Sequence, residues 1–293
     1  MMDWNKLLSS RRYQPGSTIT MFRSHDRSQF QRDYDRLIFS SPFRRLQNKT
    51  QVFPLPGNIF VHNRLTHSLE VASVGRSLGN KIAQFIKTKE TLEHPEILEE
   101  IGTIVSTACL AHDLGNPPFG HSGEEAISYF FIEGEGQYLK KLLTDEEWAD
   151  ISHFEGNANA FRLLTHSFNG RRPGGYTMTL STLASIVKYP FESKASPKGH
   201  KYGFFQSEKE IYMEVAKELG IIQLSDKPLR YVRHPLVFLV EAADDICYQI
   251  MDIEDSHKLK ILSYEETTKI LLNFYDKETD KDDLKPIART FKI

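Results

Sequence analysis

Side chains that can bind a divalent metal ion are concentrated near residue 112. His112-Asp113 ends an apolar segment (97–111) in which apolar residues recur at steps of three and four. Imidazole nitrogen and carboxylate oxygen are common ligands of divalent ions. Gly115 and Pro117 follow, and both residue types end helices. We therefore expect His112 and Asp113 at the end of a buried helix, held by a rigid turn.

A His-Asp pair alone is weak evidence, because the sequence contains another, His25-Asp26, in a polar stretch that we interpret as surface. The pair at 112 is distinguished by His121 and Glu124, which follow within the same Gly/Pro-rich turn. His121 can move a proton, and Glu124 can orient it at helical spacing. The alternative for Glu124 is structural: Ser122-x-x-Glu125 matches a capping box, and an acid beside it suits the helix dipole.

A third candidate ligand, His67, begins another apolar helical stripe. Thr66 is a plausible N-cap, which would place His67 in the first turn, beside a helix end that favours anions. Taken alone, His67 is better explained by a structural role. With Arg64 nearby it becomes a candidate metal ligand next to a phosphate clamp.

The fourth candidate is Asp244, in an otherwise apolar helix that opens after Pro235. Two adjacent acids are costly to bury unless they are paired or hold a metal. Asp245 projects about 100° away round the helix from Asp244 and so points elsewhere. Tyr248 and Asp252 follow Asp244 at steps of four and share its face. The alternative interpretation is compensation of the helix dipole plus surface carboxylates.

Helical periodicity predicts a mainly α fold, with a short β-hairpin formed by residues 52–53 and 59–61 around a Pro-Leu-Pro-Gly turn. We expect a basic N-terminal arm over residues 1–35 and one domain over residues 36–293. The arginines of the arm suit either a nucleic-acid or phosphate contact or a solvated, salt-bridged face. Residues 189–202 are rich in Pro, Ser, Lys and Gly, and are expected to form a loop.

The composition fits an ordinary globular protein, with 40% hydrophobic and 26% charged residues. A net charge of −2 gives the whole molecule no basic excess for binding nucleic acid. Two cysteines make no disulfide framework, and reduced thiols are expected. With neither a signal peptide nor an apolar run of about 20 residues, we expect a cytoplasmic protein and no membrane contact.

Taken together, these segments resemble the HD-domain superfamily, and within it the deoxyguanosine triphosphate triphosphohydrolases. The resemblance runs from about Arg36 to Asp255. It is carried by Arg44-Arg45-Leu46-Gln47, Gln51-Val52-Phe53-Pro54, Arg64-Leu65-Thr66-His67-Ser68, His112-Asp113-Leu114-Gly115-Asn116-Pro117-Pro118-Phe119-Gly120-His121, Phe154-Glu155-Gly156-Asn157 and Glu241-Ala242-Ala243-Asp244-Asp245-Ile246.

The resemblance implies a helical HD fold and a role for each matching residue. It implies one divalent ion per subunit, with Mn²⁺, Mg²⁺, Fe²⁺, Co²⁺, Ni²⁺ and Zn²⁺ not distinguished, and Mg²⁺ or Mn²⁺ accompanying the substrate. The metal ligands would be His67, His112, Asp113 and Asp244, and the acid/base pair His121 and Glu124. Triphosphate contacts would be Arg64, Lys188 and Lys201, and contacts to sugar or base Gln47, Tyr248 and Asp252.

The implied reaction cleaves dGTP at the α-phosphorus and releases deoxynucleoside and intact triphosphate. The implied assembly is a homo-oligomer, a hexamer in relatives, with single-stranded DNA as a candidate effector. Relatives of this type usually carry a further helical region, so parts of the nucleotide pocket and of the subunit contacts are expected to be missing or to come from a neighbouring chain. Two alternatives stay open: an HD-type nucleotidase or phosphodiesterase of other specificity, and a nucleotide or single-stranded DNA sensor with little turnover.

Overall fold

Helices make up nearly all the regular structure of the computed structural model, which describes residues 2–15, 27–53, 60–169, 173–196, 200–276 and 278–291. The first half contains α1 (Trp4–Leu7), α2 (Gln29–Ile38), α3 (Ser41–Arg45), η1 (Leu46–Asn48), α4 (Arg64–Lys89), η2 (Pro95–Glu100), α5 (Ile101–Ala111), α6 (His121–Ile132), η3 (Glu135–Lys141) and α7 (Asp145–Ser152). The second half contains α8 (Gly156–Thr165), α9 (Leu180–Ile186), η4 (Ser193–Ala195), η5 (Gln206–Glu208), α10 (Lys209–Leu219), β1 (Gln223–Asp226), β2 (Leu229–Tyr231), α11 (Val237–Lys258), α12 (Tyr264–Leu272) and α13 (Lys281–Phe291). The mainly α prediction is confirmed.

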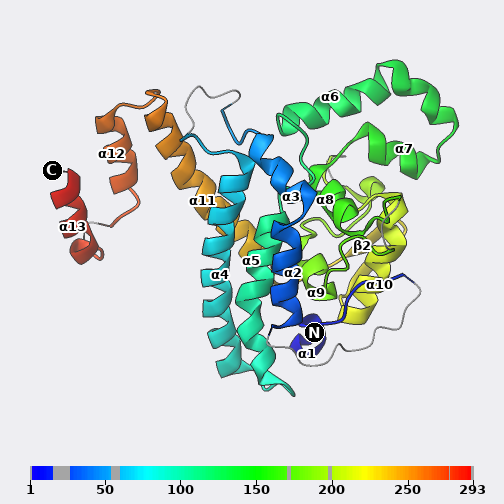
Figure 1. Cartoon of the computed structure of the whole chain (residues 1–293), viewed down its shortest axis with the longest axis horizontal. Coiled ribbons are helices and arrows are strands. Elements are labelled where there is room, and N and C mark those ends of the chain that lie inside the picture. The colour runs from blue at the N-terminus through cyan, green and yellow to red at the C-terminus, as the bar shows by residue number, and fades with distance from the viewer. Residues whose placement is uncertain are drawn as a thin grey trace.

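The core is built around α5, in which every residue but Thr103 is buried. A helix that is apolar on all sides belongs in the interior, and α5 is covered by α2, α4, α9 and α11. Figure 1 shows α4, α5 and α2 running side by side. The backbones of α4 and α5 approach closely, because a Cβ added at Gly79 would lie 2.8 Å from the Cα of Gly102.

The predicted hairpin position is wrong. The described two-stranded sheet pairs β1 with β2, antiparallel, with Asp226 opposite Leu229. Residues 51–53, 60 and 61 form bends or a turn, and Thr50 meets Asn63 in a single isolated bridge. Residues 54–59, which hold the Pro-Leu-Pro-Gly turn, lie outside the described residues. Proline and glycine mark a change of direction there without specifying strand pairing on either side.

The described residues before position 36 share the main core. Leu7, Leu8 and Tyr13 are buried in it. Arg12 forms an ion pair of 2.6 Å with Asp33, and both side chains are almost inaccessible. Asp33 also accepts a 2.8 Å hydrogen bond from the backbone N–H of Thr179. The expected surface pair His25-Asp26 lies outside the described residues.

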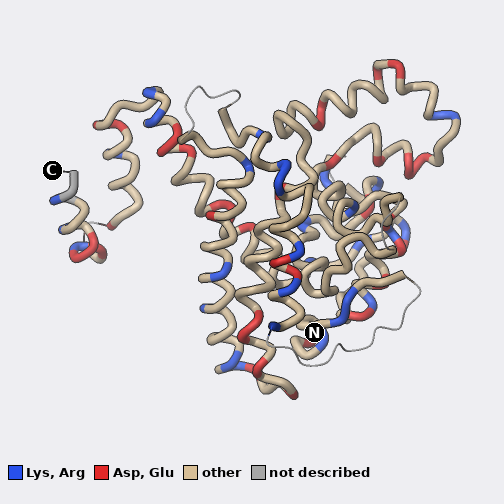
Figure 2. The backbone as a smooth tube through the Cα atoms, viewed as in Figure 1, with Lys and Arg blue, Asp and Glu red and all other residues tan. Residues whose placement is uncertain are grey.

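Two helical segments extend from the body in Figure 1: α6 with η3 and α7 in green, and α12 with α13 in orange and red. Figure 2 shows acidic and basic residues interspersed along most helices, in agreement with the small net charge. Among the described residues, no helix combines the length and apolar character that a membrane span requires. Cys109 and Cys247 are buried and free, as expected.

A buried histidine, His234, links the end of α1 to the start of α11. Leu236 donates its backbone N–H to Nδ1 of His234 at 3.2 Å, and Nε2 of the same ring lies 3.2 Å from the carbonyl oxygen of Leu7. Both nitrogens are therefore satisfied only in the neutral ring. Burial lowers the pKa of His234 from 6.5 to about 4.

We expect His234 to make the fold acid-sensitive. The folded protein resists protonation of this ring down to about pH 4, whereas the unfolded chain takes the proton near pH 6.5. The free energy of unfolding is therefore highest above pH 6.5 and falls by about 3 kcal/mol as the pH decreases toward 4. Denaturant unfolding at several pH values measures this. The free energy of unfolding should depend less steeply on pH in His234→Gln, and as steeply as in wild type in the surface control His94→Gln. Equal pH dependence in wild type and His234→Gln would contradict the assignment.

Candidate metal centre and active site

A cavity of about 330 Å³ lies where α4, α5, α6, α9 and α11 meet, within the size range of small-ligand sites. Most of the residues predicted for the site line it: Arg64, His112, Asp113, His121, Glu124, Lys188, Lys201 and Asp244. His67 is buried behind this wall. Gln47, Tyr248 and Asp252 are not among the lining residues, and Gln51 lines the cavity instead of Gln47.

His67 is the fourth residue of α4, which begins one turn earlier than Thr66 suggested. Asn63 is the N-cap, and its side chain accepts hydrogen bonds from the N–H groups of Leu65 and Thr66. The Thr66 hydroxyl oxygen accepts a hydrogen bond from the backbone N–H of Asn63, which completes a capping box. This rigid start directs His67 inward, where its Nε2 lies 2.9 Å from Oδ1 of Asp244.

His112 caps the end of α5, as the apolar segment predicts. Its Nδ1 lies 2.6 Å from the carbonyl oxygen of Cys109, so Nδ1 carries a hydrogen and Nε2 is the ring nitrogen left to bind a metal ion. The rings of His67 and His112 lie 5.3 Å apart, edge to face. A backbone carbonyl that fixes the tautomer in this way is the usual support for a metal-binding histidine.

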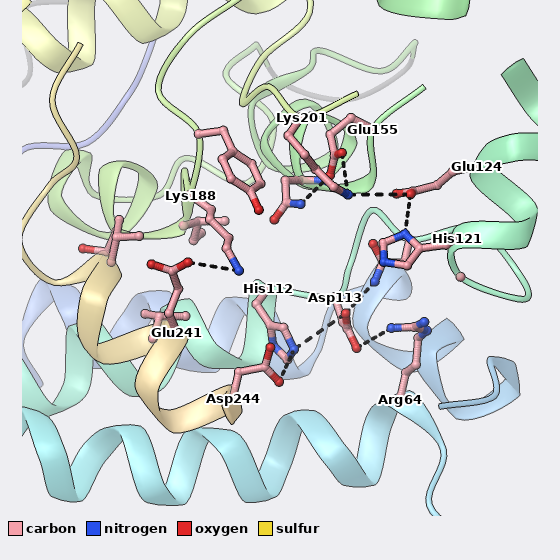
Figure 3. A pocket seen from close by; sticks show the side chains of 18 of the residues that line it. Arg64, His112, Asp113, His121, Glu124, Glu155, Lys188, Lys201, Glu241 and Asp244 are labelled. Carbon is pink, nitrogen blue, oxygen red and sulfur yellow. Dashed lines mark hydrogen bonds and ion pairs between the residues drawn. The ribbon is translucent and has the colours of Figure 1, made fainter. Parts of the chain in front are cut away.

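Asp113 is held at both oxygens. Oδ2 accepts from Arg64 at 2.6 Å, and Oδ1 accepts from the Asn116 amide at 2.5 Å. Burial alone would raise the pKa of Asp113, but His112 and Arg64 outweigh it and hold the pKa below its usual range. Arg64, predicted to clamp phosphate, thus points at a candidate metal ligand in this structure (Figure 3).

Asp244 completes the cluster from α11. Its Oδ1 lies 2.9 Å from His67 Nε2 and 3.6 Å from His112 Nε2. Burial opposes ionisation, but the His67 hydrogen bond and the charge of His112 lower the pKa of Asp244 to about 2. Asp245, next to it, is exposed.

These side chains fit a divalent ion. His67, His112 and Asp113 each offer a ligand atom, and all three atoms lie within 4.8 Å of one another. Asp244 is not part of that mutual set but contacts both of its histidines. Two imidazoles and two carboxylates suit Mn²⁺, Fe²⁺, Co²⁺, Ni²⁺ or Zn²⁺.

His121 and Glu124 form a pair beside this cluster. Oε2 of Glu124 lies 2.8 Å from His121 Nδ1, and Oε1 accepts a 2.8 Å hydrogen bond from the N–H of Gly156. Glu124 is buried, whereas the His121 side chain is 82% exposed. The suggested capping box is wrong, since α6 begins at His121 with Gly120 as its N-cap and no side-chain cap.

Gly120 is required at this turn for two reasons. Its φ of 56° lies in the region that favours glycine, and an added Cβ would lie 2.8 Å from an Arg64 nitrogen. The turn thereby sets His121 next to the Arg64–Asp113 pair.

The cavity's three Lys and Arg side chains are all paired with acids, as Figure 3 shows. Besides Arg64 with Asp113, Lys188 lies 3.0 Å from Glu241 and Lys201 lies 2.9 Å from Glu155. Burial opposes the charge of Lys188, yet the hydrogen bond to Glu241 raises its pKa above the usual value. An anion entering the cavity must therefore compete with these carboxylates.

Sequence reasoning missed several contributors to the cavity. Glu155 and Asn157 belong to the family-like motif Phe154-Glu155-Gly156-Asn157 but carry no predicted role, although an acid that caps a helix and an amide in its first turn can also face a site. Lys49 donates to the carbonyl of Asn116 at 2.6 Å and supports the turn after Asp113. Nothing in the local sequence around Lys49 indicates that contact.

Comparison with known proteins places the chain in a family. A model of the HD domain matches residues 64–227. Deoxyguanosinetriphosphate triphosphohydrolase-like proteins match with 45% identity over 277 residues in Pseudomonas aeruginosa (92% of this chain, 61% of the relative) and 43% over 305 residues in Synechocystis (99% and 68%). The chain belongs to this HD-domain family. The resemblance found in the sequence is thus confirmed.

A deoxyguanosinetriphosphate triphosphohydrolase of Yersinia enterocolitica also matches, with 34% identity over 288 residues, 86% of this chain and 54% of the relative. The chain spans about three fifths of the length of the P. aeruginosa relatives. The HD-domain match contains His67, His112 and Asp113, whereas Asp244 lies beyond its last residue.

Replacing Asp244 should remove the metal, whereas replacing its neighbour should not. Asp244→Ala takes away the carboxylate that contacts both histidines, and Asp245→Ala removes an exposed carboxylate one position further on. Elemental analysis after dialysis against Mn²⁺ should give about one ion per chain for wild type and Asp245→Ala, and a small fraction of that for Asp244→Ala. Equal losses from both changes would make the ligand assignment untenable.

Proposed function

We propose that this chain hydrolyses deoxynucleoside triphosphates, with dGTP as the substrate, to deoxynucleoside and inorganic triphosphate. The observation that carries the proposal is the placement of the His121–Glu124 pair on the same cavity as His112, Asp113 and Asp244. The names of the relatives support a deoxynucleotide substrate.

In this proposal, His67, His112, Asp113 and Asp244 hold the divalent ion, which when bound would offset charge on the α-phosphate and lower the pKa of a water molecule. His121 moves a proton at Nε2, since its Nδ1 is engaged by Glu124. Glu124 keeps the ring oriented because its other oxygen is fixed by the Gly156 N–H. Arg64 positions Asp113 through their 2.6 Å contact.

Lys188 and Lys201 bind the triphosphate: each ammonium has three hydrogens, so it can donate to a phosphate oxygen while it keeps its carboxylate partner. Both side chains are 35% exposed and can reach an incoming ligand. The cavity nevertheless carries more acid than base, and a polyanion needs added positive charge to enter it. We therefore propose that Mg²⁺ or Mn²⁺ accompanies the substrate. The cavity's carboxylates are Asp113, Glu124, Glu155, Glu241 and Asp244.

We propose that the sugar is bound by the face of α11 that carries Asp244, further along the helix. Tyr248 and Asp252 follow at successive steps of four on this helix, and Tyr248 is 42% exposed. Gln47, exposed in η1, is the proposed contact near the sugar or base. These three lie outside the described cavity, so the nucleoside would extend beyond its rim.

We also propose a cytoplasmic homo-oligomer, a hexamer by family resemblance. The described part of the α6–η3 extension exposes large apolar side chains, as oligomer contacts often do: Tyr129, Phe130, Ile132, Tyr138 and Leu142. Single-stranded DNA as an effector has weaker support, because Arg12 of the basic N-terminal arm is engaged by Asp33, and Arg36, just after the arm, by the Thr177 carbonyl.

The reaction predicts a distinctive phosphorus product. Protein, Mn²⁺ or Mg²⁺ and dGTP should yield inorganic triphosphate, because the proton carrier and metal ligands converge on the site proposed for the α-phosphorus. Phosphorus NMR identifies it directly. Pyrophosphate or orthophosphate as the sole product would rule the proposal out, and a panel of other dNTPs, NTPs and cyclic nucleotides separates it from a nucleotidase or phosphodiesterase.

Loss of the proton carrier should separate turnover from metal binding. His121→Ala leaves the four metal-binding side chains intact, so metal content should match wild type. Turnover should fall by roughly 10²–10⁴-fold, the usual cost of removing an acid or base. The exposed His94→Ala is the matched control. Near-normal turnover in His121→Ala would remove this residue from the mechanism.

A further inference from the structure

Glu155 is a fully buried carboxylate in the cavity wall, with only one cationic partner among the residues that the structure describes. It caps α8, and its Oε1 accepts from the backbone N–H of Asn157 and from the side-chain amide of the same residue. Its Oε2 makes no hydrogen bond and lies 2.9 Å from Nζ of Lys201. A buried charge with one counter-charge depends on it strongly, so Glu155 and Lys201 hold each other in place.

Lys201 also lies close to the proton-carrying pair. Its Nζ is 3.9 Å from Oε2 of Glu124, the oxygen that lies 2.8 Å from His121 Nδ1 (Figure 3). The ammonium of Lys201 and the imidazole of His121 therefore face the same carboxylate oxygen, and a closer approach of the ammonium would weaken the bond of that oxygen to the imidazole. In this structure the ammonium is nearer to Glu155 and the imidazole is nearer to Glu124.

The surrounding groups leave Lys201 few other partners. The Tyr202 hydroxyl donates to the carbonyl of Asp150, and the Asn157 amide is engaged by Glu155. The remaining oxygen of Glu124 is held by the N–H of Gly156, the residue next to Glu155. If Glu155 lost its charge, Glu124 would be the nearest carboxylate to the ammonium.

We propose that Glu155 is a positioning residue: by drawing Lys201 to itself, it keeps the ammonium from taking Glu124 Oε2 and so preserves the His121–Glu124 pair. The proposal rests on the proposed function for its kinetic consequences only. Glu155 acts through Lys201 and has no contact with the reacting atoms. The same pairing keeps Lys201 at the cavity wall, where its ammonium can donate to a phosphate oxygen while it stays paired with Glu155.

Kinetics of Glu155→Gln and of the double variant Glu155→Gln/Lys201→Met test this role. In Glu155→Gln the freed ammonium should move onto Glu124, and kcat for dGTP should fall about tenfold, part of the loss expected for a missing acid or base. Removing Lys201 as well should restore kcat to within about threefold of wild type, since coupled residues are not additive. KM should rise in the double variant because a phosphate contact is lost.

A readout without turnover separates this proposal from the proposed function. Long-range ¹H–¹⁵N spectra at pH 8 with Mg²⁺ report the tautomer of His121, assigned by its absence in His121→Asn. Wild type and the double variant should show hydrogen on Nδ1, and Glu155→Gln should shift toward hydrogen on Nε2. If wild type hydrolyses no nucleotide, the proposed function fails while this spectrum still decides the role of Glu155.

A surface pair supplies the control. Glu146→Gln removes the carboxylate that lies 2.8 Å from Lys194, outside the cavity, and should leave both kinetics and the His121 spectrum unchanged. If Glu155→Gln does not fold, Glu155→Asp shortens the reach to Lys201 and should change kcat and tautomer in the same direction. Wild-type kinetics and tautomer in the folded variant, or a double variant as slow as Glu155→Gln, would overturn the proposal.

Discussion

The close packing of α4 against α5 is the contact on which the candidate metal centre depends. Glycines on both helices let the backbones approach, and the approach brings the rings of His67 and His112 within 5.3 Å. Asp244 reaches them from α11, which packs against both helices. Because the helices belong to the core, the ligand atoms are placed by the packing of the whole domain, as a site on rigid elements requires.

Electrostatics at the cavity follow from the same packing. Carboxylates that lose contact with water need partners, and three of those at the cavity find a cation: the buried Asp113 with Arg64, the buried Glu155 with Lys201, and the half-buried Glu241 with Lys188 and Arg233. The lysines proposed to bind phosphate are thereby held at the wall before any ligand arrives. In the proposed function the lysines keep these partners while they bind phosphate, so acids with no contact to the reacting atoms would still influence turnover.

Sequence reasoning reached the residues whose local context is unusual. A His-Asp pair that ends an apolar helix before a Gly/Pro turn, and two adjacent acids in an apolar helix, both conflict with simple burial and so mark a site. The hairpin was misplaced because β1 is mostly exposed and shows no alternation, while the Pro-Leu-Pro-Gly turn looked stronger. The role of Glu155 was missed because an acid at a helix start looks like an ordinary cap, and its pairing with Lys201 spans 46 residues of chain that only the tertiary fold brings together.

The proposed chemistry depends on one cation shared by four side chains. Anomalous diffraction from crystals grown with Mn²⁺ locates that ion independently of any assay. We predict one strong peak bonded to His67, His112, Asp113 and Asp244, with Nε2 as the ligand atom of His112, since its Nδ1 is engaged by the Cys109 carbonyl. A fully loaded crystal with no peak among these residues, or with its principal peak elsewhere, would contradict the central claim.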